Sequence, residues 1–255
     1  MAKNKERAAR RRATRFYDVS IPPEAEDSQF YSEFSIIVRT VDAVNSFHYV
    51  YRSWRTGARG GPSTHAQQDL YRAMLIFACA GLDIFVKQLI KTKLPKLIGA
   101  DKSAEAKFKE HVRRGLKKDE KEMLNTVALA LIDRNPRDIL LGDYLESMTG
   151  ESLQSVEELC RVSDASGLNT KVIFDTAKRN LLKDAFTVRN QIIHEMDITV
   201  SVEGAKKTGH RTRRQRRAEV MEKHTRAILD LAQELFSAYK NRFEEFKIGT
   251  EKGSK

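Results

Sequence analysis

The sequence predicts an all-α protein, and three observations support this fold class. Apolar residues recur at spacings of three and four along most of the chain. Segments rich in glycine, proline and small polar residues separate these periodic stretches, as loops separate helices. The sequence has no internal repeat and no strand-turn-strand signature. We therefore expect a bundle of antiparallel helices.

The first predicted helix begins at Phe30 and ends near Trp54, before the loop "TGARGGPST". Thr64 followed by Gln67 is a capping box, which predicts that the next helix starts at about His65. One face of the first helix carries the apolar set Phe30, Phe34, Ile37, Val38, Val41, Val44, His48 and Tyr51.

The second predicted helix, residues 65–94, is the most apolar segment of the chain. It is hydrophobic nearly all round in its middle, which predicts a central and buried position. Shorter amphipathic helices are expected after it, with Asn135-Pro136 separating two of them. Their ranges are about 102–117, 119–133, 136–148 and 152–163.

A long helix is then expected from about residue 171 to the stretch "FTVRNQIIHEMDI". One stripe of it holds Ala177, Leu181, Ala185, Val188 and Ile192. The polar segment "DITVSVEGAKKTGH" interrupts the pattern, and a final helix is predicted over about 212–247.

These elements suggest three parts. Residues 1–27 lack apolar periodicity and are expected to form a flexible basic arm. Residues 28–248 form the helical domain, and 249–255 a flexible tail. Cys79 and Cys160 are not closely spaced, which is typical of reduced thiols in a cytoplasmic protein.

The basic charge is concentrated in two short blocks. The net charge is +11, yet residues 1–15 and 206–217 carry more than this excess, so the rest is nearly neutral. This pattern indicates a binding site for a polyanion such as RNA. The alternative is a solubilising tail and a solvated helix start. The second block contains Lys206, Lys207, Arg211, Arg213, Arg214, Arg216 and Arg217.

The sequence argues against several other classes of protein. It has no uninterrupted run of about 18 apolar residues, so no membrane-spanning helix is expected. The basic N-terminus lacks the apolar core of a secretory signal. Metal-binding spacings, glycine-rich phosphate loops and nucleophile elbows do not occur, so we expect neither a metal nor another cofactor.

Arg189, Asn190 and His194 are the candidate catalytic residues. Asn190 and His194 lie one turn apart on one helix face, and the long side chain of Arg189 could reach round to the imidazole. Histidine can act as a general base near neutral pH, and arginine offers a fork of donors to a phosphate. The spacing by itself is weak evidence, because it can arise by chance.

Asp83 is the second unusual residue, because it lies inside the apolar run "LIFACAGLDIFVKQL". A buried carboxylate normally needs a cationic partner, and Arg189 or His194 would serve. The alternative is a pair with some other lysine or arginine that only holds helices together.

The segment "VRNQIIHE" resembles the R-N-x-x-x-H signature of HEPN domains, a group of helical nucleic-acid-processing proteins. "LYRAMLIFACAGLDIFVKQLI" is similar to the earlier core helix of this family, which carries an acidic residue. The likeness is strongest to the RiboL-PSP type of prokaryotic defence systems. It covers about 28–98 and 171–247, and the helices at about 100–165 look like an insertion.

The resemblance implies a helical bundle that forms a homodimer with a composite cleft. It implies a metal-independent endoribonuclease in which Arg189, Asn190 and His194 match the motif and Asp83 supplies a supporting acid. A defence or toxin effector of this kind would have an antitoxin or sensor protein as a partner. Met196 stands where toxins paired with nucleotidyltransferase antitoxins carry a tyrosine, which argues against that subgroup.

Two other hypotheses remain open from the sequence. One is a non-catalytic HEPN-like dimer that binds nucleic acid or a partner protein. The other is a DNA-associated regulator that uses the basic arm, although no helix-turn-helix spacing supports it.

Overall fold

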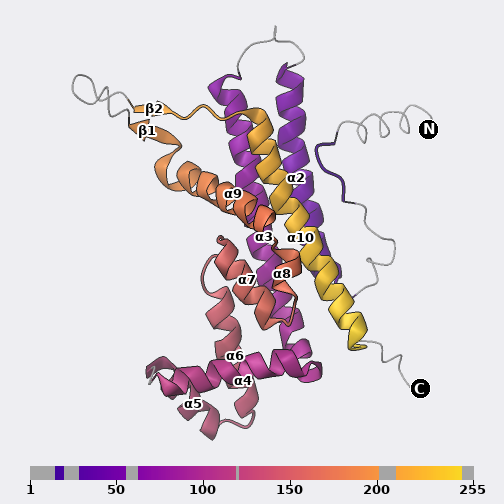
Figure 1. Ribbon diagram of the computed structural model, residues 1–255, viewed down its shortest axis with the longest axis vertical. Coiled ribbons are helices and arrows are strands. Elements are labelled where there is room, and N and C mark those ends of the chain that lie inside the picture. Colours follow the sequence, from indigo (N-terminus) through magenta and orange to yellow (C-terminus); the bar gives the residue numbers. More distant parts are fainter. Residues whose placement is uncertain (1–14, 20–28, 56–62, 119–120, 201–210, 249–255) are drawn as a thin grey trace. The chain divides into compact units, whose positions relative to one another are not determined.

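The computed structural model describes residues 15–19, 29–55, 63–118, 121–200 and 211–248 (Figure 1). The described residues are mostly helical, which confirms the all-α class. The chain divides into two compact units. The first comprises residues 1–82 and 176–232, and the second comprises residues 83–175 and 233–255. The predicted insertion lies in the second unit, and the boundary runs through two long helices.

The first unit contains α2 (Tyr31–Arg55), α9 (Thr176–Glu195) and the first parts of α3 (His65–Ala100) and α10 (Ala218–Glu245). A short antiparallel pair, β1 (Ile198–Val200) and β2 (Arg211–Arg213), follows α9. Thr199 lies opposite Thr212 at the centre of this two-stranded pair. The sequence pattern did not predict this pair of strands.

The capping box at the start of α3 is confirmed. The Thr64 amide donates to Gln67 Oε1 at 3.0 Å, and the Gln67 amide donates to Thr64 Oγ1 at 3.2 Å. Each side chain therefore satisfies a backbone donor of the other residue, and the helix starts at His65 as predicted.

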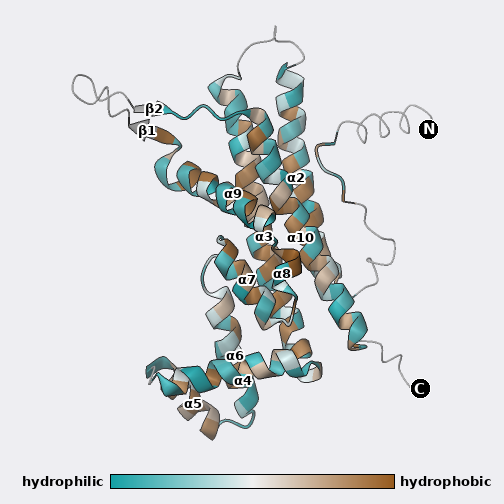
Figure 2. Ribbon diagram, viewed as in Figure 1, coloured by the Kyte–Doolittle hydropathy of each residue, from teal (hydrophilic) through white to brown (hydrophobic). Residues whose placement is uncertain are grey.

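The central position predicted for α3 is also confirmed. Met74, Leu75 and Leu82 are buried in the first unit, where Val44 of α2 and Ile228 of α10 are equally inaccessible. Gly81 allows α2 to approach α3 closely, because a Cβ there would lie 2.1 Å from Thr40 Oγ1. The polar and apolar sides of these amphipathic helices can be followed in Figure 2.

α3 is long and apolar enough, by length and composition, to cross a membrane, with a mean hydropathy of 1.8 over its most apolar window. The expectation of no membrane-spanning helix stays a prediction, because length and composition alone do not show a membrane span. Half of that window is buried inside the protein.

Part of the predicted N-terminal arm is anchored to the first unit. Phe16 and Tyr17 are buried, and the guanidinium of Arg226 lies 4.0 Å from the centre of the Phe16 ring. The Tyr17 backbone exchanges two hydrogen bonds with the Asn45 side chain, and its hydroxyl donates to Asp230 at 2.5 Å. The expectation of a flexible arm over 1–27 is thus wrong for this aromatic pair, since its rings bury apolar surface. Residues 1–14 and 20–28 lie outside the described residues, as does the predicted tail at 249–255.

The second unit contains five helices between α3 and α9, together with the last parts of α3 and α10. Asp101 caps α4 by accepting from the Ser103 amide at 2.8 Å, and it also pairs with Arg242 of α10 at 2.5 Å. Ser166 shares a hydrogen bond with the buried Tyr239 hydroxyl. The five helices are α4 (Lys102–Lys117), α5 (Lys121–Ile132), α6 (Pro136–Thr149), α7 (Val156–Ala165) and α8 (Thr170–Ile173).

The boundaries of α2 and of α4 to α7 agree with prediction to within four residues, but those of α3, α9 and α10 do not. α3 continues to Ala100 rather than to about residue 94, and α10 starts at Ala218 rather than at about residue 212, because Arg211–Arg213 form β2. A single helix was expected from about residue 171, but α8 ends at Ile173 and α9 starts at Thr176. Phe174 between them is buried and has non-helical backbone angles. Burial of this aromatic ring accompanies the break, and tertiary packing overrides the local helical pattern.

Candidate functional site

Arg189, Asn190 and His194 lie in the second half of α9, in the first unit. Asn190 and His194 are exposed, and Arg189 is half-buried. Arg189 Nη1 donates to Asn190 Oδ1 at 2.9 Å, so the structure brings these two side chains together. Within the part of the chain that the structure describes, the His194 imidazole has no hydrogen-bond or ion-pair partner. An accessible imidazole one turn from a bonded Arg–Asn pair can meet a ligand from solvent.

Arg189 also acts on the core of the first unit. Burial raises the pKa of the Cys79 thiol of α3 to about 12, and the positive charge of Arg189 opposes this rise. Cys79 is therefore a packed, protonated thiol at neutral pH. The Arg189 guanidinium, which bonds to Asn190, therefore also acts electrostatically on this thiol.

Asp83 has a cationic partner, as expected of an acid in an apolar helix. That partner is Lys87, whose Nζ lies 3.1 Å from Asp83 Oδ2 one turn further along α3. Asp83 Oδ1 also accepts from the Leu153 amide at 2.6 Å, which ties α3 to the segment before α7. These contacts match the alternative hypothesis, in which Asp83 pairs with another lysine or arginine and only holds helices together. A role for Asp83 beside Arg189 or His194 stays a prediction.

Asp197, three residues after His194, is the charged residue of this region that the sequence analysis missed. α9 ends with two residues at positive φ, Met196 and Asp197, and the Asp197 amide donates to Gln191 O at 3.0 Å. This bond, between residues six apart, closes the end of the helix. The same turn directs the Asp197 side chain inward, where it is fully buried.

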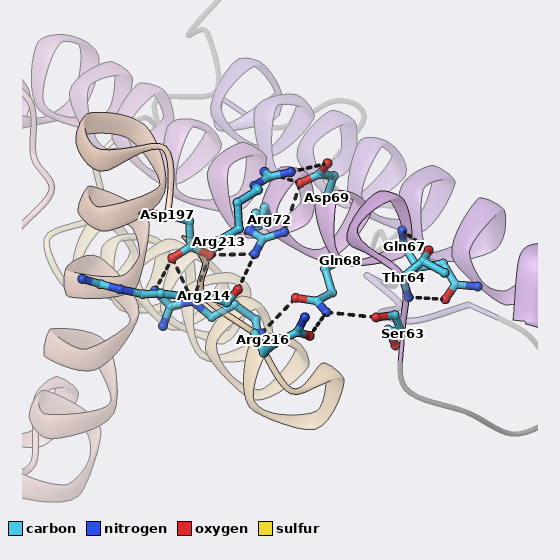
Figure 3. Close-up of polar contacts among 11 residues, drawn as sticks. Ser63, Thr64, Gln67, Gln68, Asp69, Arg72, Asp197, Arg213, Arg214 and Arg216 are labelled. Atoms are coloured by element: carbon cyan, nitrogen blue, oxygen red, sulfur yellow. Dashed lines mark hydrogen bonds and ion pairs between the residues drawn. The ribbon is translucent and has the colours of Figure 1, made fainter. Parts of the chain in front are cut away.

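Two arginines neutralise the buried Asp197 carboxylate (Figure 3). Arg72 of α3 donates through Nε at 2.8 Å, and Arg216 donates through Nη2 at 2.6 Å. Arg72 also donates through Nη2 to the Arg214 carbonyl at 2.7 Å. A buried carboxylate with several strong donors is stable in its ionised form.

The network continues along α3 through Asp69 and Gln68 (Figure 3). Asp69 accepts from Arg72 at 3.0 Å and from Arg213 at 2.6 Å. Gln68 Oε1 accepts from the Arg216 amide at 3.0 Å, and its Nε2 donates to the Ser63 carbonyl. We call the set Asp69, Arg72, Asp197, Arg213 and Arg216 the Asp197 cluster. It joins the start of α3 to the segment before α10 and to the end of α9.

The cluster changes the acidity of its carboxylates. Burial alone would raise the pKa of Asp197, but hydrogen bonds from Arg216 and Arg72 hold it below its usual range. For Asp69, burial is again the largest single effect and raises the pKa, but Arg213 and Arg72 together outweigh it and lower the pKa. Both acids are therefore ionised at neutral pH and tied to their arginines.

The basic block at 206–217 is used partly for structure. Arg213 and Arg216 belong to the Asp197 cluster, and Arg214 pairs with Glu195 at 3.2 Å. Arg217 is exposed. Lys206 and Lys207 lie outside the described residues, and only the backbone of Arg211 is described, in β2. RNA binding by this block stays a prediction, with fewer charges available for phosphate than the sequence suggests.

A sequence signal for this cluster exists in part. Asp69 and Arg72 are spaced three apart at the start of an apolar helix, which indicates a paired acid and base on one face. No pattern marks Asp197, because its inward position depends on the positive-φ turn after α9. Across the residues that the structure describes, no group of three or more His, Cys, Asp or Glu side chains is arranged to hold a metal ion.

Comparisons with known proteins do not assign the chain to a family: no family model, no curated protein and no solved structure matches it.

Proposed function

We propose that this protein is a metal-independent endoribonuclease of the HEPN type, acting as a defence or toxin effector. The observation that carries the proposal is the R-N-x-x-x-H motif on α9, with His194 exposed and Arg189 bonded to Asn190. An exposed imidazole and a guanidinium are the groups that general-base and electrostatic catalysis of phosphoryl transfer need.

In the proposed reaction, the His194 imidazole removes the proton from an RNA 2′-hydroxyl. The 2′-oxygen then forms a bond to the adjacent phosphorus, and the bond from phosphorus to the 5′-oxygen breaks. A proton is returned to the 5′-oxygen by the imidazolium of a second copy of the chain. The products are a 2′,3′-cyclic phosphate and a 5′-hydroxyl.

Arg189 stabilises the charge that develops on the non-bridging phosphate oxygens. Asn190 positions the guanidinium of Arg189, which is the role its 2.9 Å hydrogen bond supports. Asp83 remains the proposed supporting acid, acting from α3. The exposed Arg217, together with Lys206, Lys207 and Arg211 of the same block, would attract the RNA backbone.

A second candidate is a non-catalytic HEPN-like dimer that binds nucleic acid or a partner protein. Two observations favour it. Asp83 is engaged by Lys87 and Leu153, and the described arginines Arg213 and Arg216 are engaged by Asp69 and Asp197. The two candidates differ in whether RNA is cut and in whether His194 matters.

The distinguishing experiment uses the purified full chain with single-stranded RNA, and with DNA of the same sequence, in excess EDTA. We expect cleavage of RNA alone, because DNA lacks the 2′-hydroxyl. His194→Ala should lower the rate by about 10²–10⁴-fold, the range for loss of a general base. The matched control is His65→Ala, which removes another exposed histidine.

Two outcomes decide between the candidates. RNA binding without cleavage, unchanged in His194→Ala, would establish the non-catalytic module. Cleavage that needs a divalent metal would contradict the proposed mechanism. A host growth assay extends the test: expression of the wild-type chain should slow growth, whereas Arg189→Ala should not. Arg39→Ala, at an exposed arginine of α2, is the control.

The proposal includes a homodimer, an antitoxin or sensor protein as regulatory partner, a cytoplasmic location and no membrane. Homodimerisation would supply a second motif to the same cleft. Sedimentation of the purified chain measures this directly, and a monomer that still cuts RNA would remove the composite site from the proposal.

A further inference from the structure

A pocket of about 290 Å³ lies within the second unit, among α4, α6 and α7. Each helix lines it with one face, through residues spaced three or four apart. α4 contributes Lys107, Glu110, His111 and Arg114, which repeat at helical intervals. Tyr144 of α6 and Arg161 of α7 complete the polar lining that concerns us here.

His111 is held in place by a carboxylate. Its Nε2 lies 3.0 Å from Asp143 Oδ2, and Asp143 also accepts from the Thr126 hydroxyl at 3.1 Å. The His111 ring packs against Tyr144 at 4.9 Å between ring centres. A carboxylate at one ring nitrogen fixes the orientation of the imidazole.

The two acids of the lining are already neutralised by neighbouring cations. Asp164 pairs with Lys107 at 2.5 Å, and Glu110 accepts from Arg113 Nε at 2.9 Å. Arg161 uses one donor on the Ser147 carbonyl at 3.2 Å and has no ion-pair partner among the residues that the structure describes. Among the described residues, the Arg114 side chain has no hydrogen-bond or ion-pair partner.

The two remaining arginines act on the same point of the pocket. Burial raises the pKa of Tyr144 to about 12, helped by Asp164, while the charges of Arg114 and Arg161 oppose the rise. Arg114, Arg161, Tyr144 and His111 all line this one pocket. Two cations that share a pocket with a hydroxyl and a carboxylate-held imidazole are suited to a dianion.

We propose that this pocket binds a small phosphate monoester, with Arg114 and Arg161 as its charge partners and His111 as an additional donor. The size of the pocket fits a ligand of about the size of a phosphate or a small nucleotide rather than a polymer. The site lies in a different unit from the R-N-x-x-x-H motif and does not depend on the proposed ribonuclease activity.

Isothermal titration of the full chain with inorganic phosphate and with adenosine 5′-monophosphate tests this. We expect binding of both probes in the wild-type protein, about tenfold weaker in Arg114→Ala and lost in Arg114→Ala/Arg161→Ala. Arg134→Ala, at an exposed arginine outside the pocket, should bind like the wild type. Tighter binding of the nucleotide would identify the nucleoside as part of the ligand.

NMR of the histidine rings provides a second readout that does not depend on affinity. Phosphate should shift the His111 ring resonances in the wild type and in His194→Ala, but not in the double arginine variant. Circular dichroism should show unchanged helicity in every variant. The proposal fails if neither probe binds, if Arg134→Ala weakens binding equally, or if the resonances of His111 do not move.

Discussion

The Asp197 cluster and the exposed face of α9 are neighbours along the chain, but they differ in how their polar groups are satisfied. Asp197 is fully buried and takes hydrogen bonds from Arg72 and Arg216. His194, three residues earlier, is exposed and has no such partner among the described residues. Charges with partners inside the protein contribute to stability, whereas accessible ones are available to a ligand.

The largest effect should follow from breaking the cluster. Asp197→Ala takes the buried carboxylate away from Arg72 and Arg216 and leaves Arg72 with the partly exposed Asp69, so we expect the free energy of unfolding to fall by about 3–5 kcal/mol. Asp197→Asn should lose less, because asparagine tolerates positive φ and can still accept hydrogen bonds. Urea denaturation measures both. Glu151→Ala, at an exposed acid, is the control, and an equal loss there would contradict the assignment.

The next largest loss of stability is expected at Gly81, where α2 and α3 approach each other closely. Gly81→Ala places a Cβ against Thr40 Oγ1, Cγ2 and Cβ, so rotation of the Thr40 side chain cannot relieve the clash. The expected cost is about 1–3 kcal/mol, typical of overpacking. Thr40→Gly/Gly81→Ala should recover much of it. Thermal unfolding measures the pair, and a stable Gly81→Ala variant would show that α2 and α3 can separate without loss.

Lowering the pH should reduce the contribution of the Asp197 cluster to stability. The folded-state pKa values of Asp197 and Asp69 lie below their ordinary value, so their contribution is present above about pH 4, the unfolded-state value. It is lost as the pH falls through the folded-state pKa values. Stability measured from pH 6 to 2 should therefore decline less steeply in Asp197→Asn than in the wild type. Parallel curves would show that these carboxylates are not linked to folding.

The capping box should contribute a smaller amount. Thr64→Ala removes the acceptor for the Gln67 amide, and we expect a loss of about 0.5–2 kcal/mol. Thr64→Ser keeps the hydroxyl and should behave like the wild type. Hydrogen exchange at the first turn of α3 reports the effect locally. Equal exchange in the two variants would mean that the start of α3 is held by Gln68 and its contacts instead.

The smallest change in stability should come from the exposed face of α9. His194→Ala and Asn190→Ala remove accessible side chains, so unfolding should change by no more than about 0.5 kcal/mol. The exposed His194 should thus contribute little to stability, in contrast to the buried Asp197. A loss of several kcal/mol in His194→Ala would place this histidine among the residues that hold the fold.

Much of the fold follows from local sequence patterns. The apolar periodicity and the Thr64–Gln67 box predicted α3 and its burial, and Pro136 marked the start of α6. The break at Phe174 and the anchoring of Phe16 depend on packing with distant residues, which periodicity does not encode.

Only the part of the candidate site that depends on helical spacing could be predicted from the sequence. Helical geometry places Asn190 and His194 on one face of α9 and Arg189 to one side of it. The structure shows Asn190 and His194 exposed and Arg189 half-buried. Asp83 pairs with Lys87 one turn away, which helical spacing allows, but its bond from the Leu153 amide and the pair of Arg216 with Asp197 join segments that lie apart along the chain. Such pairings depend on tertiary structure, so charge and spacing alone pointed to other roles.

The chemistry of the products tests the central claim most directly. A defined single-stranded RNA is incubated with the wild-type chain in excess EDTA, and the fragment ends are identified by mass spectrometry. The account predicts 2′,3′-cyclic phosphate and 5′-hydroxyl ends, absent with His194→Ala and retained with His65→Ala. Intact RNA with the wild-type chain, or the same products with His194→Ala, would contradict it.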